Sequence, residues 1–243
     1  MFYAVGDIHG CYDEFMKMLE KIDFKPGFDK LFFVGDYIDR GPQSYEMLSW
    51  LEENHTYDCF KFIRGNHEQE FIAYVDLLNS VDSELSKEAI YEQLNGRSEY
   101  YDLYGTLGRL IKDGHIDKLS YWADMFRKMP TSCLFHYDRQ DYIITHAGYK
   151  MGLHGEEKEE FNLYARGNAY TEGGRKRTII IAGHTPTIVK DEFTYNKGNV
   201  FIHCNEDMKC TFYNIDCGCC FKPQVPNAKL ACLRLDDKEI FYI

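Results

Sequence analysis

The sequence predicts an α/β fold with two β-sheets. In the first 68 residues, short apolar runs alternate with helical patterns, which is typical of a mostly parallel sheet. Residues 67–128 have a largely helical pattern, and strands and hairpins follow one another from residue 131 onward. We therefore expect a half rich in parallel pairs, followed by a half rich in antiparallel pairs.

The N-terminal half consists of three strands with two helices between them. Each strand is a short apolar run that ends at a glycine or tight turn, as in "FYAVGDIHG" (2–10), "LFFVGDYIDRG" (31–41) and "CFKFIRGNHE" (59–68). Apolar residues recur at helical spacing in 11–22 and again in 43–53. These two segments are therefore predicted to be the helices that connect the strands.

The middle and the C-terminal part follow other patterns. The helical segment is expected to break near Asn95–Gly96 and near Gly114, and the tyrosines of 98–105 are read as packing residues, with a substrate groove as the alternative. "YDRQDY" (137–142) is a predicted turn. Near the C-terminus, "TFYNID", "LACLRLD" and "EIFYI" are predicted to be antiparallel strands.

Composition limits the classes of protein that fit. With 243 residues, 44% of them hydrophobic, and no linker or repeat, residues 1–243 are expected to form one domain. The formal net charge of −11 argues against a nucleic-acid partner, because such proteins neutralise phosphates with basic residues. No apolar run approaches the length of a membrane span and no signal peptide is recognisable, so we expect a cytoplasmic protein without membrane contact.

The cysteines favour reduced thiols over a disulfide framework. There are nine, an odd number, scattered over a large chain. The densest group spans 204–220, where a structural zinc site is conceivable, but it contains no CxxC pair. We expect these cysteines to be small buried side chains.

Polar residues follow five of the predicted strands. Ligands of α/β sheets gather outside the carboxyl ends of strands, which is where all five groups are expected. Together they offer three histidines, two aspartates and one asparagine, a donor set suited to two divalent metals: Asp7, His9, Asp36, Asn66, His146 and His184. Six side chains can serve two ions only if one carboxylate bridges them, and Asp36 is the natural candidate.

The motifs GDIHG, GDYIDRG, GNHE, THAG and GHTP, in this order, resemble those of the calcineurin-like metallophosphoesterases. More narrowly, they resemble the phosphoprotein phosphatase branch, which includes bacterial serine/threonine phosphatases. The resemblance implies a two-sheet β-sandwich flanked by helices, with layers in the order α/β/β/α. It also implies two divalent metal ions, with manganese expected first and iron or zinc as alternatives.

The resemblance also implies a role for each motif residue. One metal would be held by Asp7, His9 and Asp36, and the other by Asp36, Asn66, His146 and His184. Four further residues would act on the substrate: His67 as general acid, Asp39 as the carboxylate that orients it, and Arg40 and Arg166 as phosphate-binding arginines. Arg175 and Arg177 lie nearby and remain alternatives to Arg166.

These roles imply attack of a metal-bound hydroxide on phosphorus while His67 protonates the departing oxygen. Two divalent metals and two arginines outweigh the carboxylates, so an acidic protein would hold a locally cationic pocket. The expected substrate is a phosphomonoester, namely phosphoserine or phosphothreonine in a protein. The alternative substrate is diadenosine tetraphosphate, cleaved symmetrically, because the same branch of the family performs that reaction.

A metal-bearing scaffold protein is the non-enzymatic alternative, although a scaffold would have no need of His67, Asp39 and Arg40. The partner is thus a phosphorylated protein or a small phosphoester. The oligomeric state stays open.

Overall fold

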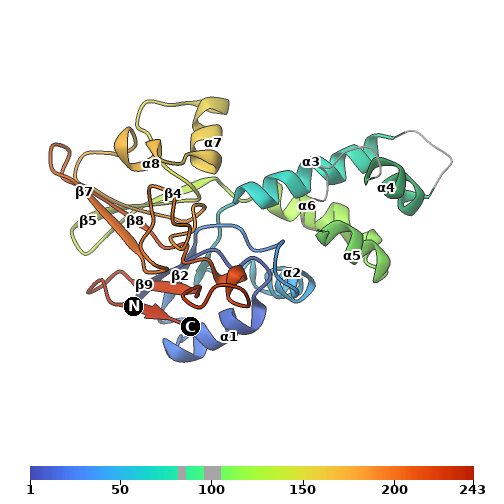
Figure 1. Ribbon diagram of the computed structural model, residues 1–243, viewed down its shortest axis with the longest axis horizontal. Coiled ribbons are helices and arrows are strands. Elements are labelled where there is room, and N and C mark those ends of the chain that lie inside the picture. The colour runs from blue at the N-terminus through green and yellow to red at the C-terminus, as the bar shows by residue number, and fades with distance from the viewer. Residues whose placement is uncertain (82–85, 96–104) are drawn as a thin grey trace.

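The computed structural model describes residues 1–81, 86–95 and 105–243 and contains two five-stranded sheets. The first, sheet A, has the strand order β10-β9-β1-β2-β3, and the second, sheet B, has the order β4-β5-β6-β8-β7. Figure 1 shows the two sheets together at one end of the molecule, with α3, α4, α5 and α6 extending away from them. The predicted α/β fold with two sheets flanked by helices is confirmed.

Sheet A joins the two ends of the chain. Three parallel strands come from the N-terminal part: β1 (Phe2–Val5), β2 (Lys30–Phe33) and β3 (Phe60–Lys61). The last two strands complete it in antiparallel fashion, β9 (Ala231–Arg234) on β1 and β10 (Ile240–Tyr242) on β9. β1 therefore lies inside the sheet, between its N-terminal and C-terminal parts.

Sheet B has a parallel centre and antiparallel edges. At the centre, β5 (Gln140–Thr145), β6 (Thr178–Ala182) and β8 (Cys210–Asn214) run parallel. The hairpin partner β4 (Ser132–Tyr137) and the strand β7 (Phe201–Asn205) form the edges. The predicted turn at "YDRQDY" is confirmed as the connection between β4 and β5.

The expected half rich in parallel pairs and half rich in antiparallel pairs are confirmed in part: the N-terminal strands pair in parallel and most pairings of the later strands are antiparallel, but the centre of sheet B is parallel and both sheets are mixed. β8, which contains most of "TFYNID", pairs antiparallel with β7 but parallel with β6. The two strands that follow it leave sheet B and complete sheet A. The apolar pattern marks these strands, but their pairing partners depend on long-range packing.

Successive side chains along each strand point to opposite faces of its sheet, and this alternation separates the layers. Tyr3 and Val5 face a core shared with the helices, whereas Ala4 between them faces the core between the two sheets. Ile180 and Ile181 alternate in the same way on sheet B. A period of two is what a strand buried on both faces requires. The layers are thus helices, sheet A, sheet B and helices.

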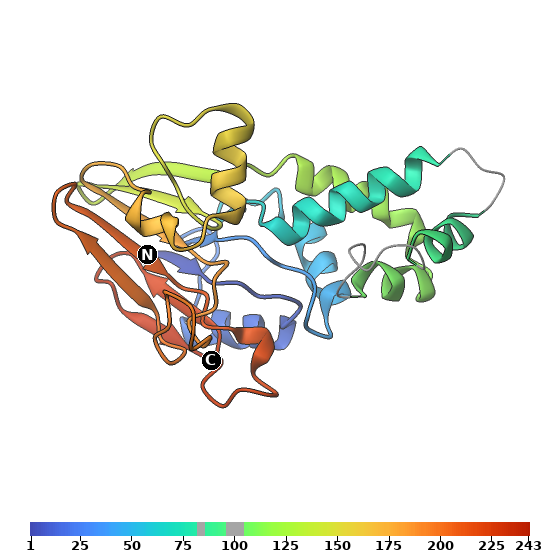
Figure 2. The same cartoon turned by 45° about the horizontal axis from the view of Figure 1, so that its top comes forward.

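The helices cover the outer faces of the sheets (Figures 1 and 2). Side chains of α1 (Tyr12–Lys21) and α2 (Ser44–Asn54) pack in the core of sheet A, and those of α7 (Gly155–Tyr164) and α8 (Asn168–Thr171) pack in the outer core of sheet B. The middle of the chain forms α3 (Asn66–Ser80), α4 (Lys87–Asn95), α5 (Thr106–Lys112), the short 3₁₀ helix η1 (Ile116–Lys118) and α6 (Leu119–Arg127).

The described helices of the middle segment agree with the expected pattern. The break near Gly114 is confirmed, and α4 ends at Asn95 as expected, whereas Gly96 and the tyrosines of 98–104 lie outside the described residues. No helix in the described ranges has the length and apolar character that crossing a membrane requires.

Candidate metal centre

The five predicted polar groups meet at one edge of the paired sheets. Asp7 and His9 follow β1, Asp36 follows β2, and Asn66 and His67 begin α3 just after β3. On the other side, His146 follows β5 and His184 follows β6. The carboxyl ends of the parallel strands therefore bring together residues that are far apart in sequence, as expected.

The backbone at this edge is unusual. Five of its non-glycine residues have a positive φ angle, in the left-handed region that side chains disfavour: His9 (48°), Asp36 (54°), Asp39 (72°), Arg40 (65°) and His184 (72°). Such conformations cost roughly 1–3 kcal/mol each and persist where the surrounding structure enforces them. Their concentration at one edge marks a functional site whose side chains are oriented in advance.

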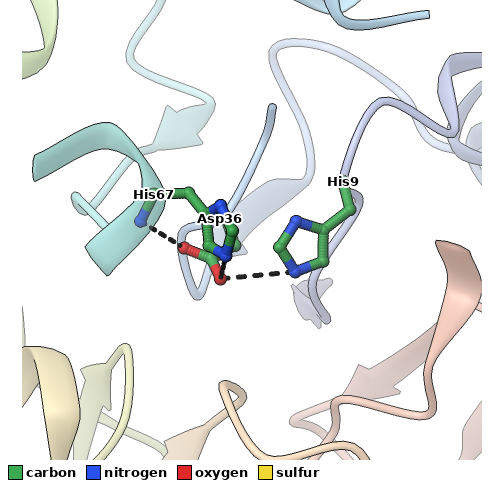
Figure 3. A group of neighbouring side chains, drawn as sticks. All are labelled: His9, Asp36 and His67. Atoms are coloured by element: carbon green, nitrogen blue, oxygen red, sulfur yellow. Dashed lines mark hydrogen bonds and ion pairs between the residues drawn. The ribbon is translucent and has the colours of Figure 1, made fainter. Parts of the chain in front are cut away.

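Asp36 lies at the centre of the site. Its Oδ2 is 3.4 Å from His9 Nε2 and 3.9 Å from His67 Nε2, and the dashed lines in Figure 3 mark the contacts of the carboxylate with both residues. Its Oδ1 is 3.4 Å from His146 Nε2 on the sheet B side. Each carboxylate oxygen thus faces a different group of potential ligands, which is the arrangement a bridging carboxylate needs.

Asn66 and two histidines form the group on the sheet B side. Asn66 Oδ1 is 2.9 Å from His146 Nε2 and 3.0 Å from His184 Nδ1. The two imidazole nitrogens are 3.1 Å apart. One amide oxygen and two imidazole nitrogens that converge on a single point, next to Asp36 Oδ1, are a typical ligand set for a divalent metal.

Two hydrogen bonds orient the histidine rings. His9 Nδ1 is 2.9 Å from the Ile38 carbonyl oxygen, and His146 Nδ1 is 2.8 Å from the Val34 carbonyl oxygen. Because a carbonyl only accepts, each Nδ1 carries the proton, and the Nε2 lone pair faces the centre of the site. Burial lowers the pKa of both imidazoles, which favours the neutral form that binds metals.

His67 differs from the other histidines of the site. Its Nδ1 donates to Asp39 Oδ2 at 2.7 Å, and its Nε2 lies 3.3 Å from Arg40 Nη2. Burial disfavours a charged imidazole, but the carboxylates of Asp36 and Asp39 outweigh burial and raise the pKa of His67 to about 9. The two carboxylates thus favour the protonated imidazole, the form that can donate a proton.

The structure groups these side chains slightly differently from the motif expectation. His67 joins His9 and Asp36 in one close cluster, and the other cluster contains Asp36, His146 and His184. Asp7 instead accepts a hydrogen bond from the His184 backbone N–H at 2.9 Å. Its other oxygen packs against Gly183, where a Cβ atom would lie 1.8 Å away, so only glycine fits there.

Asp216 is a buried carboxylate at this edge that the sequence interpretation missed. It follows β8, is 1% exposed, and raises the pKa of Asp7 after the larger effect of burial. Among the described residues, three buried polar atoms here have no hydrogen-bond partner: Asp7 Oδ1, His184 Nε2 and Asp216 Oδ2. Buried carboxylates need compensating charge. These residues therefore fit bound cations.

Glu68, the last residue of the GNHE motif, supports the backbone of the site, a role that the sequence analysis did not predict. Its carboxylate is fully buried and accepts the backbone N–H groups of Asp36 (2.9 Å), Tyr37 (2.8 Å) and Gly65 (2.9 Å). Burial, followed by the charge of Asp36, raises the pKa of Glu68 to about 8. Glu68 thereby ties the loop after β2 to the start of α3.

Arg166 lies closer to the site than the two alternative arginines. Its Nη1 donates to Thr185 Oγ1 at 3.5 Å, and its charge contributes to lowering the pKa of His184, after burial and His146. Arg177 precedes β6 and so lies at the amino end of that strand, away from His184, and Arg175 lies two residues further from the strand.

The cysteines are free thiols, and five of the nine are buried. In the part of the chain that the structure describes, neither cluster that could hold a metal contains a cysteine. Within the 204–220 group, Cys210, Cys217 and Cys219 are buried as expected, but Cys220 is half-buried, and the expectation is wrong for Cys204, which is exposed.

Comparison with known proteins places this site in a family context. A family model described as calcineurin-like phosphoesterase matches residues 1–219. The symmetrical bis(5'-nucleosyl)-tetraphosphatase of Buchnera aphidicola is 36% identical over 148 residues, which are 60% of this chain and 43% of that protein. The chain thus spans less than half the length of this relative.

Two further comparisons extend over more of the chain. The asymmetrical bis(5'-nucleosyl)-tetraphosphatase PrpE of Halalkalibacterium halodurans is 27% identical over 209 residues, 76% of this chain and 78% of that protein. The structure of a protein serine/threonine phosphatase from Saccharomyces cerevisiae superposes with a TM-score of 0.55 at 16% identity, covering 100% of this chain and 78% of that one. The latter likeness shows a shared fold.

Proposed function

Because the chain belongs to the calcineurin-like phosphoesterase family, we propose that it is a metal-dependent phosphoesterase that hydrolyses dinucleoside tetraphosphates. The observation that carries the chemistry is Asp36, whose two oxygens face two separate groups of buried ligands. Two divalent cations bound there would polarise the phosphate and activate a water for in-line attack. Asp7, His9 and Asp36 would hold one, and Asp36, Asn66, His146 and His184 the other.

The remaining residues act on the substrate. Arg40 and Arg166 approach the metal ligands from opposite sheets, and guanidinium groups bind phosphate oxygens with two parallel hydrogen bonds. His67 presents its Nε2 at the same place, held there by the hydrogen bond from Nδ1 to Asp39. We assign His67 as the general acid that protonates the leaving oxygen.

The charge of the site suits a highly anionic substrate. Asp216 adds a negative charge that the sequence-based count lacked, so two divalent cations and two arginines are partly balanced by Asp7, Asp36 and Asp216, while Asp39 pairs with His67 and the raised pKa of Glu68 favours its neutral form. The cations and arginines still outnumber these carboxylates. A tetraphosphate chain, which carries several negative charges, is attracted to such a pocket more strongly than a single phosphomonoester.

The choice of substrate departs from the first expectation. The sequence motifs favoured phosphoserine or phosphothreonine, with a diadenosine tetraphosphate as the alternative. The names of the two tetraphosphatases that resemble this chain support the alternative better. The relative with the higher identity is named symmetrical, so we expect water to attack one of the two central phosphorus atoms and release two ADP.

Product analysis tests this proposal. The purified protein with added Mn²⁺ is incubated with diadenosine tetraphosphate, and separately with a phosphoserine peptide, and nucleotides are separated by anion-exchange chromatography. We expect ADP as the sole nucleotide product and a larger kcat/KM than for the peptide. ATP and AMP as products would show that the protein cleaves diadenosine tetraphosphate asymmetrically. Faster hydrolysis of the phosphopeptide would contradict the proposal and support the first expectation, a protein phosphatase.

The metal requirement is tested separately. Imidazole, carboxylate and amide oxygen ligands accept manganese, iron or zinc, and availability decides among them more than affinity does. We expect Mn²⁺ to restore activity after chelation, with Fe²⁺ and Zn²⁺ as comparison ions. Activity that survives exhaustive chelation would contradict the metal-dependent mechanism, and a folded but inactive metal-loaded protein would favour the scaffold.

A further inference from the structure

We propose that Phe221 is the platform of a nucleobase subsite next to Arg40. The inference rests on the proposed function and adds to it the part of the substrate that no metal or arginine recognises. Phe221 is a half-buried ring in the short 3₁₀ helix η2 (Cys219–Phe221), which follows β8 and Asp216. Its ring centroid lies 5.7 Å from the guanidinium carbon of Arg40.

A depression that is more open than enclosed lies at this contact. It has a volume of about 620 Å³ and is lined by Arg40, Cys220, Phe221 and Gln224. Ligand sites typically measure about 300–1,000 Å³ and combine apolar walls with a few polar groups. Here one wall is an aromatic ring, one is a phosphate-binding cation, and Gln224 supplies an amide that can both donate and accept.

The chemistry of the lining points to a nucleotide. A ligand that fits must carry an anionic group for Arg40 and, one short linker away, a flat ring for Phe221. Bases stack on aromatic side chains because every base has a π-face, and such stacking tolerates different bases. A nucleoside phosphate has both parts, whereas a phosphoserine residue carries no ring of its own.

The backbone that carries the ring is held in place before any ligand arrives. Gly218, with φ of 75°, donates its backbone N–H to Asp216 Oδ1 at 2.9 Å, which ties the start of η2 to the metal centre. The Phe221 N–H donates to the Gly218 carbonyl at 2.9 Å, and the Phe221 carbonyl accepts from Val225 at 2.8 Å. A pre-organised platform loses little entropy on binding.

Binding of ADP, the expected product, tests the subsite without relying on turnover. Isothermal titration calorimetry of the Mn²⁺-loaded protein compares ADP with inorganic pyrophosphate, which has the phosphates but no base. In Phe221→Ala we expect Kd for ADP to rise roughly 5- to 150-fold, the range that base–aromatic stacking typically supplies, with Kd for pyrophosphate unchanged.

Three further variants keep the test sharp. Phe221→Trp should retain ADP affinity, and Phe221→Leu, which keeps an apolar side chain without an aromatic face, should lose it. Phe28→Ala is the matched control, because Phe28 is an 85% exposed ring that precedes β2 at its amino end. We expect it to bind both probes as the wild type does.

The outcomes separate this inference from the proposed function. Equal losses for ADP and pyrophosphate in Phe221→Ala would mean that the ring merely positions Arg40, and unchanged ADP affinity in Phe221→Ala and Phe221→Leu would remove the subsite. Either result leaves hydrolysis of diadenosine tetraphosphate untouched. Conversely, the wild-type protein could fail to cleave diadenosine tetraphosphate while Phe221→Ala still loses affinity for ADP alone. That result would support the nucleobase subsite and contradict the proposed tetraphosphatase activity.

Discussion

Sheet A and sheet B contribute to the metal centre in different ways. The loops of sheet A carry Asp36, the proposed bridging ligand, and His67, the proposed proton donor, within one stretch of the chain, 7–67, and Glu68 fastens those loops to each other. The loops of sheet B bring His146, Arg166, His184 and Asp216 from four separate places. In the proposed mechanism sheet A thus provides the reactive residues, and sheet B completes the metal and phosphate ligands.

Asp36→Asn should have the largest effect, because Asp36 faces ligands from both sheets. An amide lacks the charge that balances two cations, although asparagine tolerates the left-handed backbone at this position. We expect turnover to fall by more than the roughly 10⁴-fold that a single general acid can supply. Metal analysis should show weakened occupancy of both positions.

The comparison variant is His184→Ala, which removes a ligand from sheet B alone. It should weaken one metal position and leave the other occupied. One opposing result is that Asp36→Asn retains two tightly bound metals with normal turnover, and another is that both variants lose both metals equally. Either result would contradict the claim that Asp36 serves both metal positions and His184 only one.

His67→Asn should have the next largest effect and should spare the metals. Loss of a general acid typically costs about 10²–10⁴-fold, and we expect this loss for phosphoserine, whose alkoxide leaving group needs a proton. The loss should be clearly smaller for diadenosine tetraphosphate, because ADP departs readily as an anion. Turnover of both substrates, with metal content, is the measurement. Equal losses would mean that His67 binds the phosphate and does not act as the acid.

Arg40→Ala and Arg166→Ala should have intermediate effects, one for each sheet. A hydrogen bond to a charged group contributes about 1.5–3 kcal/mol, so we expect kcat/KM to fall roughly 10- to 100-fold in each variant for every substrate. Arg177→Ala is the control, since Arg177 lies at the amino end of β6. A larger loss in Arg177→Ala than in Arg166→Ala would reassign the second phosphate-binding arginine.

Asp216→Asn should have the smallest effect of the series. Residues next to metal ligands typically contribute about 10- to 100-fold to metal affinity, and we expect the lower end of that range because Asp216 belongs to neither close cluster. Calorimetric titration of the metal-free protein with Mn²⁺ measures it. Unchanged affinity would show that the buried carboxylate serves only the turn at Gly218.

The difference between the sheets also explains what the sequence could predict. Asp7, Asp36 and Asn66 were placed correctly at one edge because each follows an apolar run in a strand–helix alternation, and that pattern implies parallel strands with their carboxyl ends together. The same reasoning located His146 and His184 on sheet B. Fold class and the assembled residues could thus be read from local patterns.

Asp216 was not predicted as a site residue because the direction of its strand was misjudged. "YNID" has the same form as the other five motifs, a strand followed by a polar side chain, but the strand was predicted to be antiparallel. Its parallel pairing with β6, which sets Asn214 beside Ala182, is what brings Asp216 to the site. Glu68 escaped for another reason: its partners are backbone N–H groups, which leave no mark on the sequence.

The position of β1 between β2 and β9 has a consequence for how the protein is made. On the ribosome, Phe2–Val5 is made long before its partner Ala231–Arg234. Contacts between such distant segments slow folding, because a very long loop must close before they form. We therefore expect nascent chains to expose an unpaired edge on β1 until Ala231–Arg234 has been translated, and Asp7 and His9, which follow that strand, to reach their final positions late.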